Sequence, residues 1–393
     1  MVRFRICGNQ LCHSCQFVNW PVLSAGDRQG KIGKTDNTPG WIFTGFIFKL
    51  RIGMRDFLER KCERVTYYTR HFFADALPYK IYEKRLAQLY LQLKNEGLED
   101  TVIDRVSFYN KLPRSTLLQQ RGILAKDIPL EATYYYYDLK EHLNYFQRDI
   151  QLHYKFGDLN HLLDKPSFCK ARPICSNNSN SVLCKLDKFR HFRWAVDELS
   201  FGEKRKACVW RGGLHNDARR LLVEKYHQDR RHNIGHVGPG IGSLKAKEWL
   251  SSQDQFAYRY IVSIEGYDVA TNLKSVLASQ SVCFMRKPKI ESWFMESRLQ
   301  PGIHYVELRD DFSDLAEKVD YYDQHEEEAL SIVRAANNHV RQFTNLRTEK
   351  IISILVMQKY FESIGQLEHS QFTQMFWPYS AAKELQLPTT SHP

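Results

Sequence analysis

The chain has 393 residues, which is enough for two domains of ordinary size. Apolar residues make up 43% and charged residues 26%, a balance that excludes an intrinsically disordered chain. The formal net charge of +11 favours an anionic partner, namely nucleic acid, a phosphorylated small molecule or an acidic membrane surface, without choosing between them.

Nine cysteines are spread along the chain, an odd number without the spacing of a disulfide framework. This usage predicts free thiols and a reducing compartment. The first fifteen residues are basic but contain no apolar segment typical of a secretory signal. The apolar run at 41–50 is too short and too interrupted to span a bilayer. We expect a cytoplasmic protein, either free or peripheral to a membrane.

Residues 1–53 differ from the rest, since they are rich in Gly, Asn, Asp and Pro and lack sustained periodicity. A C-x4-C-x2-C spacing relates Cys7, Cys12 and Cys15, and His13 lies among them. A fourth zinc ligand at normal spacing is missing. A poorly ordered N-terminal extension is therefore the expectation, and no metal site is predicted. Met54, which precedes a clean helical run, is an alternative start of the native protein.

Residues 54–150 are predicted to be mainly helical. The segment 80–98 keeps apolar residues at three- and four-residue spacing, with Gly97 at its end. Residues 151–200 change character, with short strand-like runs separated by Pro, Ser and Asn.

From about residue 205 the pattern alternates between strands and helices. Strands are predicted in ACVWRG, YRYIVSIEG, SVCFM and HYVEL, and helices in NDARRLLVEKYH, DVATNLKSVLASQ, ESWFMESRL and DFSDLAEKVDYY. Such alternation predicts an α/β fold with a mostly parallel sheet and helices on its faces. Two further helices, 325–344 and 347–363, are predicted near the end of the chain.

The stretch VWRGGLHNDARRLL is the first candidate anion site. Its strand ends at Arg211, and Gly212 and Gly213 let the backbone turn and approach a ligand closely. Asn216 or Asp217 caps the next helix, and Arg219 lies in its first turn, where free N–H groups favour an anion. The alternative is a surface turn with solvated arginines.

The stretch EGYDVATNLKSVLASQ is the second candidate. Gly266 is predicted to end a strand with Glu265 at its tip, and Asp268 to cap the next helix. The first turn, from Ala270 through Thr271 to Asn272, would then offer hydrogen bonds to a sugar or a phosphate. The alternative is a capped core helix with an incidental polar start. Residues 233–242 are expected to be a flexible loop, and the chain has no Walker A sequence.

Five stretches, taken in order, resemble family 90 glycosyltransferases. They are VWRG…R, YRYIVSIEGYDVATNLKSVLASQSV, ESWFME, PGIHYVEL and DFSDL. The resemblance covers roughly residues 150–345, and the branch of bacterial lipopolysaccharide-modifying enzymes looks most similar. It implies a GT-B architecture, in which two Rossmann-like domains face each other across a cleft. The implied organisation is an acceptor-side domain at 54–200, a nucleotide-sugar domain at 201–345, and a C-terminal helix and tail at 346–393 that pack back on the first domain.

The resemblance also implies the activity. We expect an inverting transferase that moves a sugar from a UDP-sugar to a lipopolysaccharide core or a related surface glycan, without metal. The nucleotide sugar would be a co-substrate, with no further cofactor and no nucleic-acid partner. The expected location is the cytoplasm, including the cytoplasmic face of the inner membrane.

The resemblance assigns roles to individual residues. Arg219 corresponds to an arginine that contacts the nucleotide sugar in the animal members, whereas Gly213 and Asn272 stand where those members have Ser and Arg. Asp158, in FGDLNHLLDKPSFCKARP, is the expected base that deprotonates the acceptor hydroxyl, and Asp164 is the reserve candidate.

Four more residues are candidate contacts to the acceptor or to phosphate. Lys170 and Arg172 follow Asp158 on the same side, and solvated side chains are the alternative. Glu291 and Trp293 are expected at a helix start near the cleft, where Trp293 would stack on a sugar or else pack in the core.

Two other functions stay open from the sequence. A basic nucleic-acid-binding protein fits the charge and the aromatic content, although the basic residues are dispersed and no reader motif is present. An inactive glycosyltransferase-like scaffold fits the departures at Gly213 and Asn272.

Overall fold

The computed structural model describes residues 61–116, 121–194, 196–240, 242, 244–370 and 373–376. All of them belong to one compact unit, Lys61–Pro393. The expected N-terminal extension, with Cys7, Cys12, Cys15 and His13, lies outside the described residues, as does Met54.

Helices form the first part of the described chain, as the periodicity predicted. Residues 61–75 are helical, and α2 (Tyr79–Glu96), α3 (Asp100–Tyr109) and α4 (Thr133–Leu143) follow. Gly97 ends α2 with φ 78°, a left-handed conformation in which glycine avoids the strain of a side chain.

Short strands follow between residues 123 and 183. β1 (Ile123–Leu124) pairs antiparallel with β2 (Gln151–Leu152). β3 (Tyr154–Lys155), β4 (Ser167–Cys169) and β6 (Ser181–Leu183) form a parallel sheet. β5 (Ala171–Pro173) instead pairs antiparallel with β11 (Ile290–Ser292), which links this region to a segment about 120 residues later.

The largest sheet has five parallel strands in the order β12-β10-β9-β7-β8. The strands are β7 (Arg205–Gly212), β8 (Asn233–His236), β9 (Tyr258–Val262), β10 (Val282–Met285) and β12 (Val306–Glu307). The connecting helices are α6 (Asp217–Tyr226), α7 (Ser252–Phe256) and α8 (Leu273–Ala278). The predicted α/β class is therefore confirmed, with a doubly wound sheet.

Side chains of this sheet alternate between two apolar clusters, because successive residues of a strand point to opposite faces. In β7, Ala207 and Val209 belong to one cluster, whereas Cys208 and Trp210 belong to the other. The second cluster includes apolar residues of α6 and of α9 (Leu315–Gln324), while α8 contributes to the first. Both faces of the sheet are thus covered.

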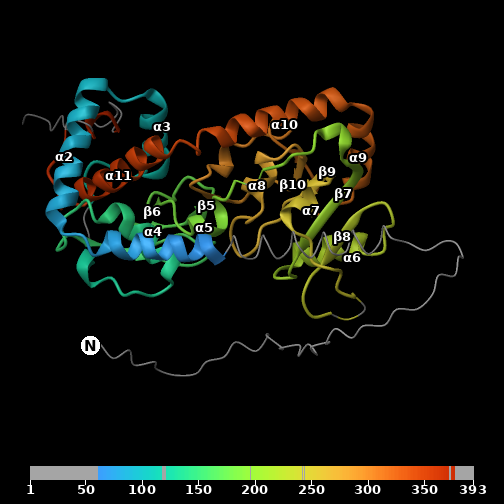
Figure 1. Ribbon diagram of the computed structural model, residues 1–393, viewed down its shortest axis with the longest axis horizontal. Coiled ribbons are helices and arrows are strands. Elements are labelled where there is room, and N and C mark those ends of the chain that lie inside the picture. Colours follow the sequence, from blue (N-terminus) through green and yellow to red (C-terminus); the bar gives the residue numbers. More distant parts are fainter. Residues whose placement is uncertain are drawn as a thin grey trace, which may run out of the picture. The chain divides into compact units, whose positions relative to one another are not determined.

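Two long helices close the chain. α10 (Glu326–Arg341) packs against α8 and β10, and α11 (Leu346–Ser363) packs against α3 and α4 (Figure 1). Ala329 and Ile332 of α10 lie in the second cluster, whereas Ala336 and Val340 lie in the first. α10 therefore ties the parallel sheet to the helical region around α11.

The segment ESWFMESRL is not the helix that the sequence predicted. Its first residues form β11, and only Glu296–Arg298 form a single 3-10 turn. Trp293, Phe294 and Met295 are all buried, which one helix face cannot achieve for three consecutive residues. Met295 has φ 57°, so the backbone turns there rather than continuing a helix.

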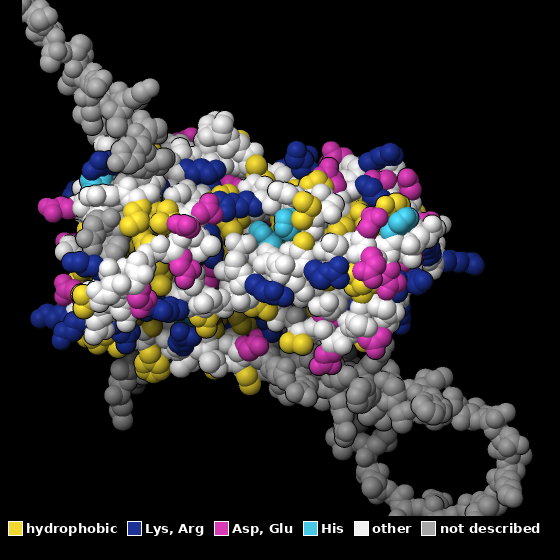
Figure 2. All heavy atoms as spheres, turned by 90° about the horizontal axis from the view of Figure 1, so that it is seen from above, with side chains coloured by type: hydrophobic (Ala, Val, Ile, Leu, Met, Phe, Trp, Pro, Cys, Tyr) yellow, Lys and Arg dark blue, Asp and Glu magenta, His cyan; other side chains and the backbone are white. Residues whose placement is uncertain are grey.

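Three surface observations complete the description. Among the described residues, none of the helices has both the length and the apolar character needed to cross a membrane. The described cysteines are free thiols, and four of the six are buried. Figure 2 shows a face on which Lys and Arg side chains are interspersed with Asp and Glu and do not gather into one basic stripe.

Candidate functional site

The carboxyl ends of the five parallel strands meet at one edge of the large sheet. In chain order the strands occupy positions 2-1-3-4-5, so the connections reverse direction between β7 and β9. Ligands in such sheets bind at this switch point, outside the strand ends. Both segments that the sequence singled out lie at these strand ends, since 211–219 begins in the last two residues of β7 and 265–272 follows β9.

The turn after β7 has room only for glycine as it stands. A Cβ atom at Gly212 would lie 2.7 Å from the Trp210 ring, and one at Gly213 would lie 2.7 Å from the His215 ring. The next helix begins as predicted, because the side chain of Asn216 accepts a hydrogen bond from the backbone N–H of Arg219 at 3.0 Å.

Arg219 and Asn216 join the two segments. The Arg219 guanidinium donates to the carbonyl oxygens of Ile264 and Glu265 at 3.0 Å and of Gly213 at 3.2 Å. The Asn216 amide donates to the carbonyl oxygens of Glu265 and Gly266, both at 2.9 Å. A guanidinium has five N–H donors, so Arg219 retains capacity for an anion while it fixes the backbone of the turn.

Arg211 lies on the other side of β7. Its guanidinium donates to the Asn233 side chain at 2.6 Å and to the carbonyl oxygens of Asn233, Trp210 and Glu248 at 2.7–2.9 Å. These bonds hold β7 to β8 and to the segment before α7. The structure therefore engages Arg211 with the protein itself, and does not combine it with Arg219 into a pair of free cations.

The segment after β9 differs from its prediction. β9 ends at Val262, and α8 begins only at Leu273, so Gly266 does not end a strand and Asp268 does not cap the helix. Asn272 occupies the capping position, but its side chain bonds backward, donating to the Val262 carbonyl and accepting from Ser263, both at 3.1 Å. Ala270 is buried, whereas Thr271 is exposed at the sheet edge.

Asp268 instead faces Lys170. The Lys170 ammonium lies 2.8 Å from the Asp268 carboxylate and 2.7 Å from the Asp158 carboxylate. Lys170 and Asp268 are almost fully buried, whereas the Asp158 side chain is 36% exposed. The structure thus brings together three predicted site residues that lie up to 110 positions apart, from two different parts of the chain.

Charge keeps this cluster together. Burial alone would lower the pKa of the Lys170 ammonium, but the two carboxylates raise it above its ordinary value, so Lys170 is positively charged at neutral pH. Asp158 keeps the exposure that a group contacting substrate needs. Asp164, the reserve candidate, is exposed as well and has no ion pair with a described residue.

Lys170 and the other three predicted acceptor contacts, Arg172, Glu291 and Trp293, are all buried. Arg172 is fully buried, pairs with Glu291 at 2.7 Å and donates to the carbonyl oxygens of Phe108, Tyr109 and Ser181. Trp293 is 1% exposed and stacks on Tyr109 with ring centroids 3.9 Å apart. The prediction of acceptor contact was wrong for these residues, and the core-packing alternative holds for Trp293.

Sequence analysis missed Arg286, which directly follows β10 at the same sheet edge. Its guanidinium lies 3.6 Å from the carboxylates of both Glu265 and Asp310, and its buried Nε has no hydrogen-bond partner among the described residues. A basic residue directly after a buried parallel strand was the signal that could have revealed it.

Asp187 was missed too. It is buried, has φ 55°, and pairs with Arg190 at 2.9 Å. Burial raises the pKa of its carboxyl to about 6, although Arg190 and Lys170 lower it. Asp187 therefore contributes negative charge near Lys170, and its carboxylate does not reach substrate.

One group of side chains has the composition of a metal site. His71, Asp138 and Glu141 place ligand atoms within 4.8 Å of one another. The Lys188 ammonium, however, contacts both carboxylates, at 3.4 Å from Asp138 and closer to Glu141. A cation already contacts both carboxylates, so these residues do not offer a free ligand set for a metal ion.

Comparison with known proteins gives consistent results. The family model described as Glycosyl transferase family 90 matches residues 186–368. O-glucosyltransferase LpsA of Dichelobacter nodosus is 37% identical over 307 residues, which cover 77% of this chain and 96% of that protein. Protein O-glucosyltransferase 2 of Danio rerio is 35% identical over 118 residues, 29% of this chain and 22% of that protein. Protein O-glucosyltransferase 3 of Homo sapiens is 29% identical over 110 residues, 28% and 21% of the two chains.

Proposed function

Because the chain belongs to glycosyl transferase family 90, we propose that it transfers a sugar from a UDP-sugar to a hydroxyl group of a lipopolysaccharide core or a related surface glycan. The chain is a glycosyltransferase by this membership, and the donor and the acceptor are the proposed part. Three relatives named O-glucosyltransferases support glucose as the sugar.

The observation that carries the proposal is the bridge from Asp158 through Lys170 to Asp268. It connects the expected base to the segment after β9, where a nucleotide sugar would lie at the switch point. A base must be within hydrogen-bond reach of the attacking hydroxyl, so a partly exposed carboxylate tethered to the donor segment suits that role.

The proposed reaction is a single displacement with inversion. The acceptor oxygen forms a bond to the anomeric carbon while the bond from that carbon to UDP breaks. Asp158 takes the proton of the acceptor hydroxyl, and the diphosphate leaves with the electron pair of the broken bond. Arg219, Arg286 and the N-terminus of α6 would stabilise the charge that grows on the diphosphate.

The same cations support a reaction without metal, because they would supply positive charge at the leaving diphosphate. We also propose that the large sheet is the nucleotide-binding half of a GT-B enzyme, within residues 201–345, and that residues 54–200 with the helix at 346–363 form the acceptor side. We propose the cytoplasm as its location, including the cytoplasmic face of the inner membrane.

Calorimetric titration with UDP and UDP-glucose tests the donor site. We expect Arg219→Ala to weaken UDP binding about tenfold or more, because a charge-assisted hydrogen bond and the anchored turn are both lost. The matched control is Arg220→Ala, which removes an exposed arginine one position along the same helix and should leave the affinity unchanged.

Asp158→Asn separates binding from chemistry. The variant should still bind UDP but transfer glucose about 100- to 10,000-fold more slowly, the range expected for loss of a general base. Asp164→Asn is the control and should retain activity. Failure of the wild-type protein to bind any nucleotide would contradict the proposed function.

A further inference from the structure

A cavity lies between helix 61–75, α4, α5 (Lys188–His191) and the start of α11. Its volume is about 610 Å³, within the range of pockets that bind small molecules. None of the sheet-edge residues discussed above lines it. Six basic side chains do: Arg70, Lys185, Lys188, Arg193, Arg347 and Lys350.

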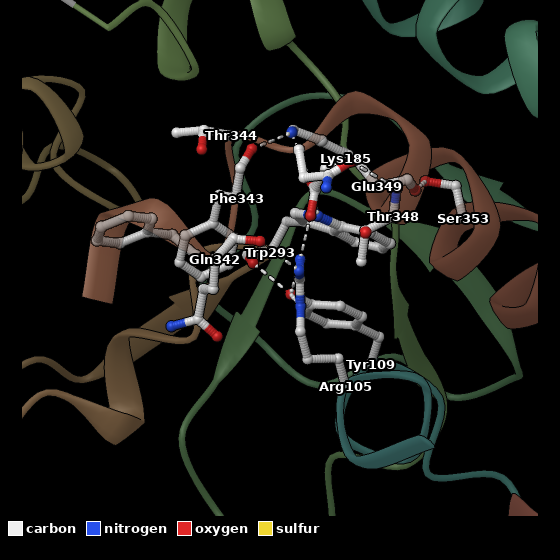
Figure 3. Close-up of polar contacts among 12 residues, drawn as sticks. Arg105, Tyr109, Lys185, Trp293, Gln342, Phe343, Thr344, Thr348, Glu349 and Ser353 are labelled. Carbon is white, nitrogen blue, oxygen red and sulfur yellow. Dashed lines mark hydrogen bonds and ion pairs between the residues drawn. The ribbon is translucent and has the colours of Figure 1, made fainter. Parts of the chain in front are cut away.

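The acidic side chains of the cavity do not balance this charge. Glu141 contacts Lys188, and Glu349 lies 2.6 Å from both Arg105 and Lys185 (Figure 3). Both carboxylates are therefore already neutralised inside the protein. Of the remaining basic residues, Arg193 and Arg347 are held only by exposed ion pairs, and the Lys350 ammonium lies over the Tyr145 ring, 5.1 Å from its centroid.

Arg193 and Arg347 form such exposed pairs, with Glu63 and Glu96, each at 2.7 Å. Exposed ion pairs contribute little and exchange readily for a better partner. Arg70 and Lys350 have no carboxylate within ion-pair distance in the part of the chain that the structure describes.

Arg70 and Lys350 also line an adjoining cavity of about 220 Å³. The two cavities share His71, Glu141 and His142 as well, so the unpaired cations stand where the cavities meet. Burial lowers the pKa of His71 to about 4 and that of His142 to about 3, so both rings are neutral at pH 7 and offer hydrogen bonds rather than charge.

Three aromatic rings, Tyr67, Phe189 and Phe192, complete the larger cavity. Flat rings supply apolar contact area, and the Tyr67 hydroxyl donates to Asp138 at 2.7 Å, which fixes that ring. Phe192 also borders a small enclosed space beside Lys170 and His191.

We propose that this cavity binds an anionic saccharide, one that carries a phosphate or a carboxylate group. Arg70 and Lys350 would contact the anionic group, and the aromatic rings would contact the sugar. We assign the cavity to recognition of the acceptor, at a distance from the hydroxyl that is glycosylated. This last assignment rests on the proposed function, whereas binding of the anionic saccharide does not.

Calorimetry on the full chain tests the site with three probes: glucose 6-phosphate, glucuronate and glucose. The wild-type protein should bind one or both anionic sugars and not glucose, and the tighter of the two identifies the preferred group. Arg70→Gln combined with Lys350→Gln should weaken that binding about tenfold or more, since two charge-assisted contacts are lost.

The matched control combines Lys206→Gln with Arg334→Gln, which removes the same charge from two exposed positions outside both cavities. Its affinity for the anionic sugars should equal that of the wild-type protein. If both double variants lost affinity equally, the effect would come from net charge, and the proposal would be overturned. A wild-type protein that binds neither anionic sugar would overturn it as well.

UDP is titrated into the same samples, so that the two proposals can fail separately. Binding of UDP without binding of either anionic sugar overturns the cavity proposal and keeps the donor site. Binding of an anionic sugar that depends on Arg70 and Lys350, without binding of UDP, keeps the cavity and overturns the proposed function.

Discussion

Lys170 is the residue on which the candidate site depends most. Its ammonium lies between the carboxylates of Asp158 and Asp268, and 3% of its side chain is exposed. A buried charge without a partner is costly, and the cost of removing one member of such a pair comes mainly from the charge that stays behind. Lys170 therefore holds the donor segment and the expected base in one arrangement.

Lys170→Met should destabilise the protein by about 3–5 kcal/mol, because the buried Asp268 carboxylate loses its counter-charge. The free energy of unfolding in urea measures this loss. Asp268→Asn in the Lys170→Met background should recover part of the loss, since a neutral amide needs no counter-charge. If the effects of the two substitutions on the free energy of unfolding simply add, within about 0.5 kcal/mol, the two residues are not coupled.

The sequence could predict the residue types of the site but not which charges are already paired. Arg219 and Asp158 were found because each follows a strand-like run or a family motif, and the structure leaves both partly exposed. Arg172 and Glu291 look equally suitable in the sequence, yet they neutralise each other across the β5–β11 pairing. That pairing joins residues 119 positions apart, beyond the reach of local patterns.

At the scale of elements, periodic segments were predictable. Apolar spacing predicted the helices at 79–96, 217–226 and 315–324 and four strands of the large sheet. The expectation of a flexible loop at 233–242 was wrong for its first residues, because 233–236 form β8 and pair with β7. The segment 291–296 was not predictable, because all of its side chains are buried, with contacts to Tyr109 of α3, His339 of α10 and Glu349 of α11. Tertiary burial removes the polar face that distinguishes a surface helix from a strand or a loop.

Glu349 shows how α11 is fixed to other elements. Its carboxylate accepts hydrogen bonds from Lys185 at 2.6 Å and from the Trp293 ring N–H at 2.8 Å, and it pairs with Arg105 of α3 (Figure 3). Three segments that are distant in the sequence therefore converge on one buried carboxylate.

Glu349→Gln should destabilise the protein by about 3–5 kcal/mol, because Arg105 and Lys185 would remain as buried cations without an anion. Urea unfolding provides the measurement. Glu328→Gln, at an exposed position of α10, is the control and should change the free energy of unfolding by about 0.5 kcal/mol or less. A similar effect of both substitutions would argue against the role of Glu349 as a buried anchor.

At the scale of the whole molecule, buried histidines connect stability to pH. Burial lowers the pKa of His142 to about 3 and of His339 to about 4, and holds the pKa of His191 well below its ordinary value. These rings are neutral in the folded protein, whereas in the unfolded chain they take up protons below about pH 6.5. The raised pKa values of the Asp138, Asp187 and Asp268 carboxyls act in the opposite direction, because the folded protein binds protons there at a higher pH than the unfolded chain, whose carboxyls bind them near pH 4.

The sign of the pH effect follows from proton binding. Between pH 6.5 and 4 the unfolded chain holds more protons on these histidines than the folded protein does, so the free energy of unfolding falls as the pH falls. Each such histidine contributes about 1.4 kcal/mol per pH unit. Aspartates whose folded pKa is raised bind protons in the folded state over part of this window, and Asp187, with a pKa of about 6, offsets about one histidine.

We therefore expect the urea midpoint to decrease steadily from pH 7 to pH 4.5, with a flatter slope in His339→Gln. In the wild-type protein the His339 Nε2 bonds to the Phe294 carbonyl at 3.0 Å, and a glutamine amide can replace that donor without titrating. The slope of the free energy of unfolding against pH should decrease by up to about 1.4 kcal/mol per pH unit, which is the contribution of one histidine. His325→Gln is the control, because that ring is exposed on the surface. If the slope stayed the same in His339→Gln, protonation of the unfolded chain at other groups would have to cause the loss of stability.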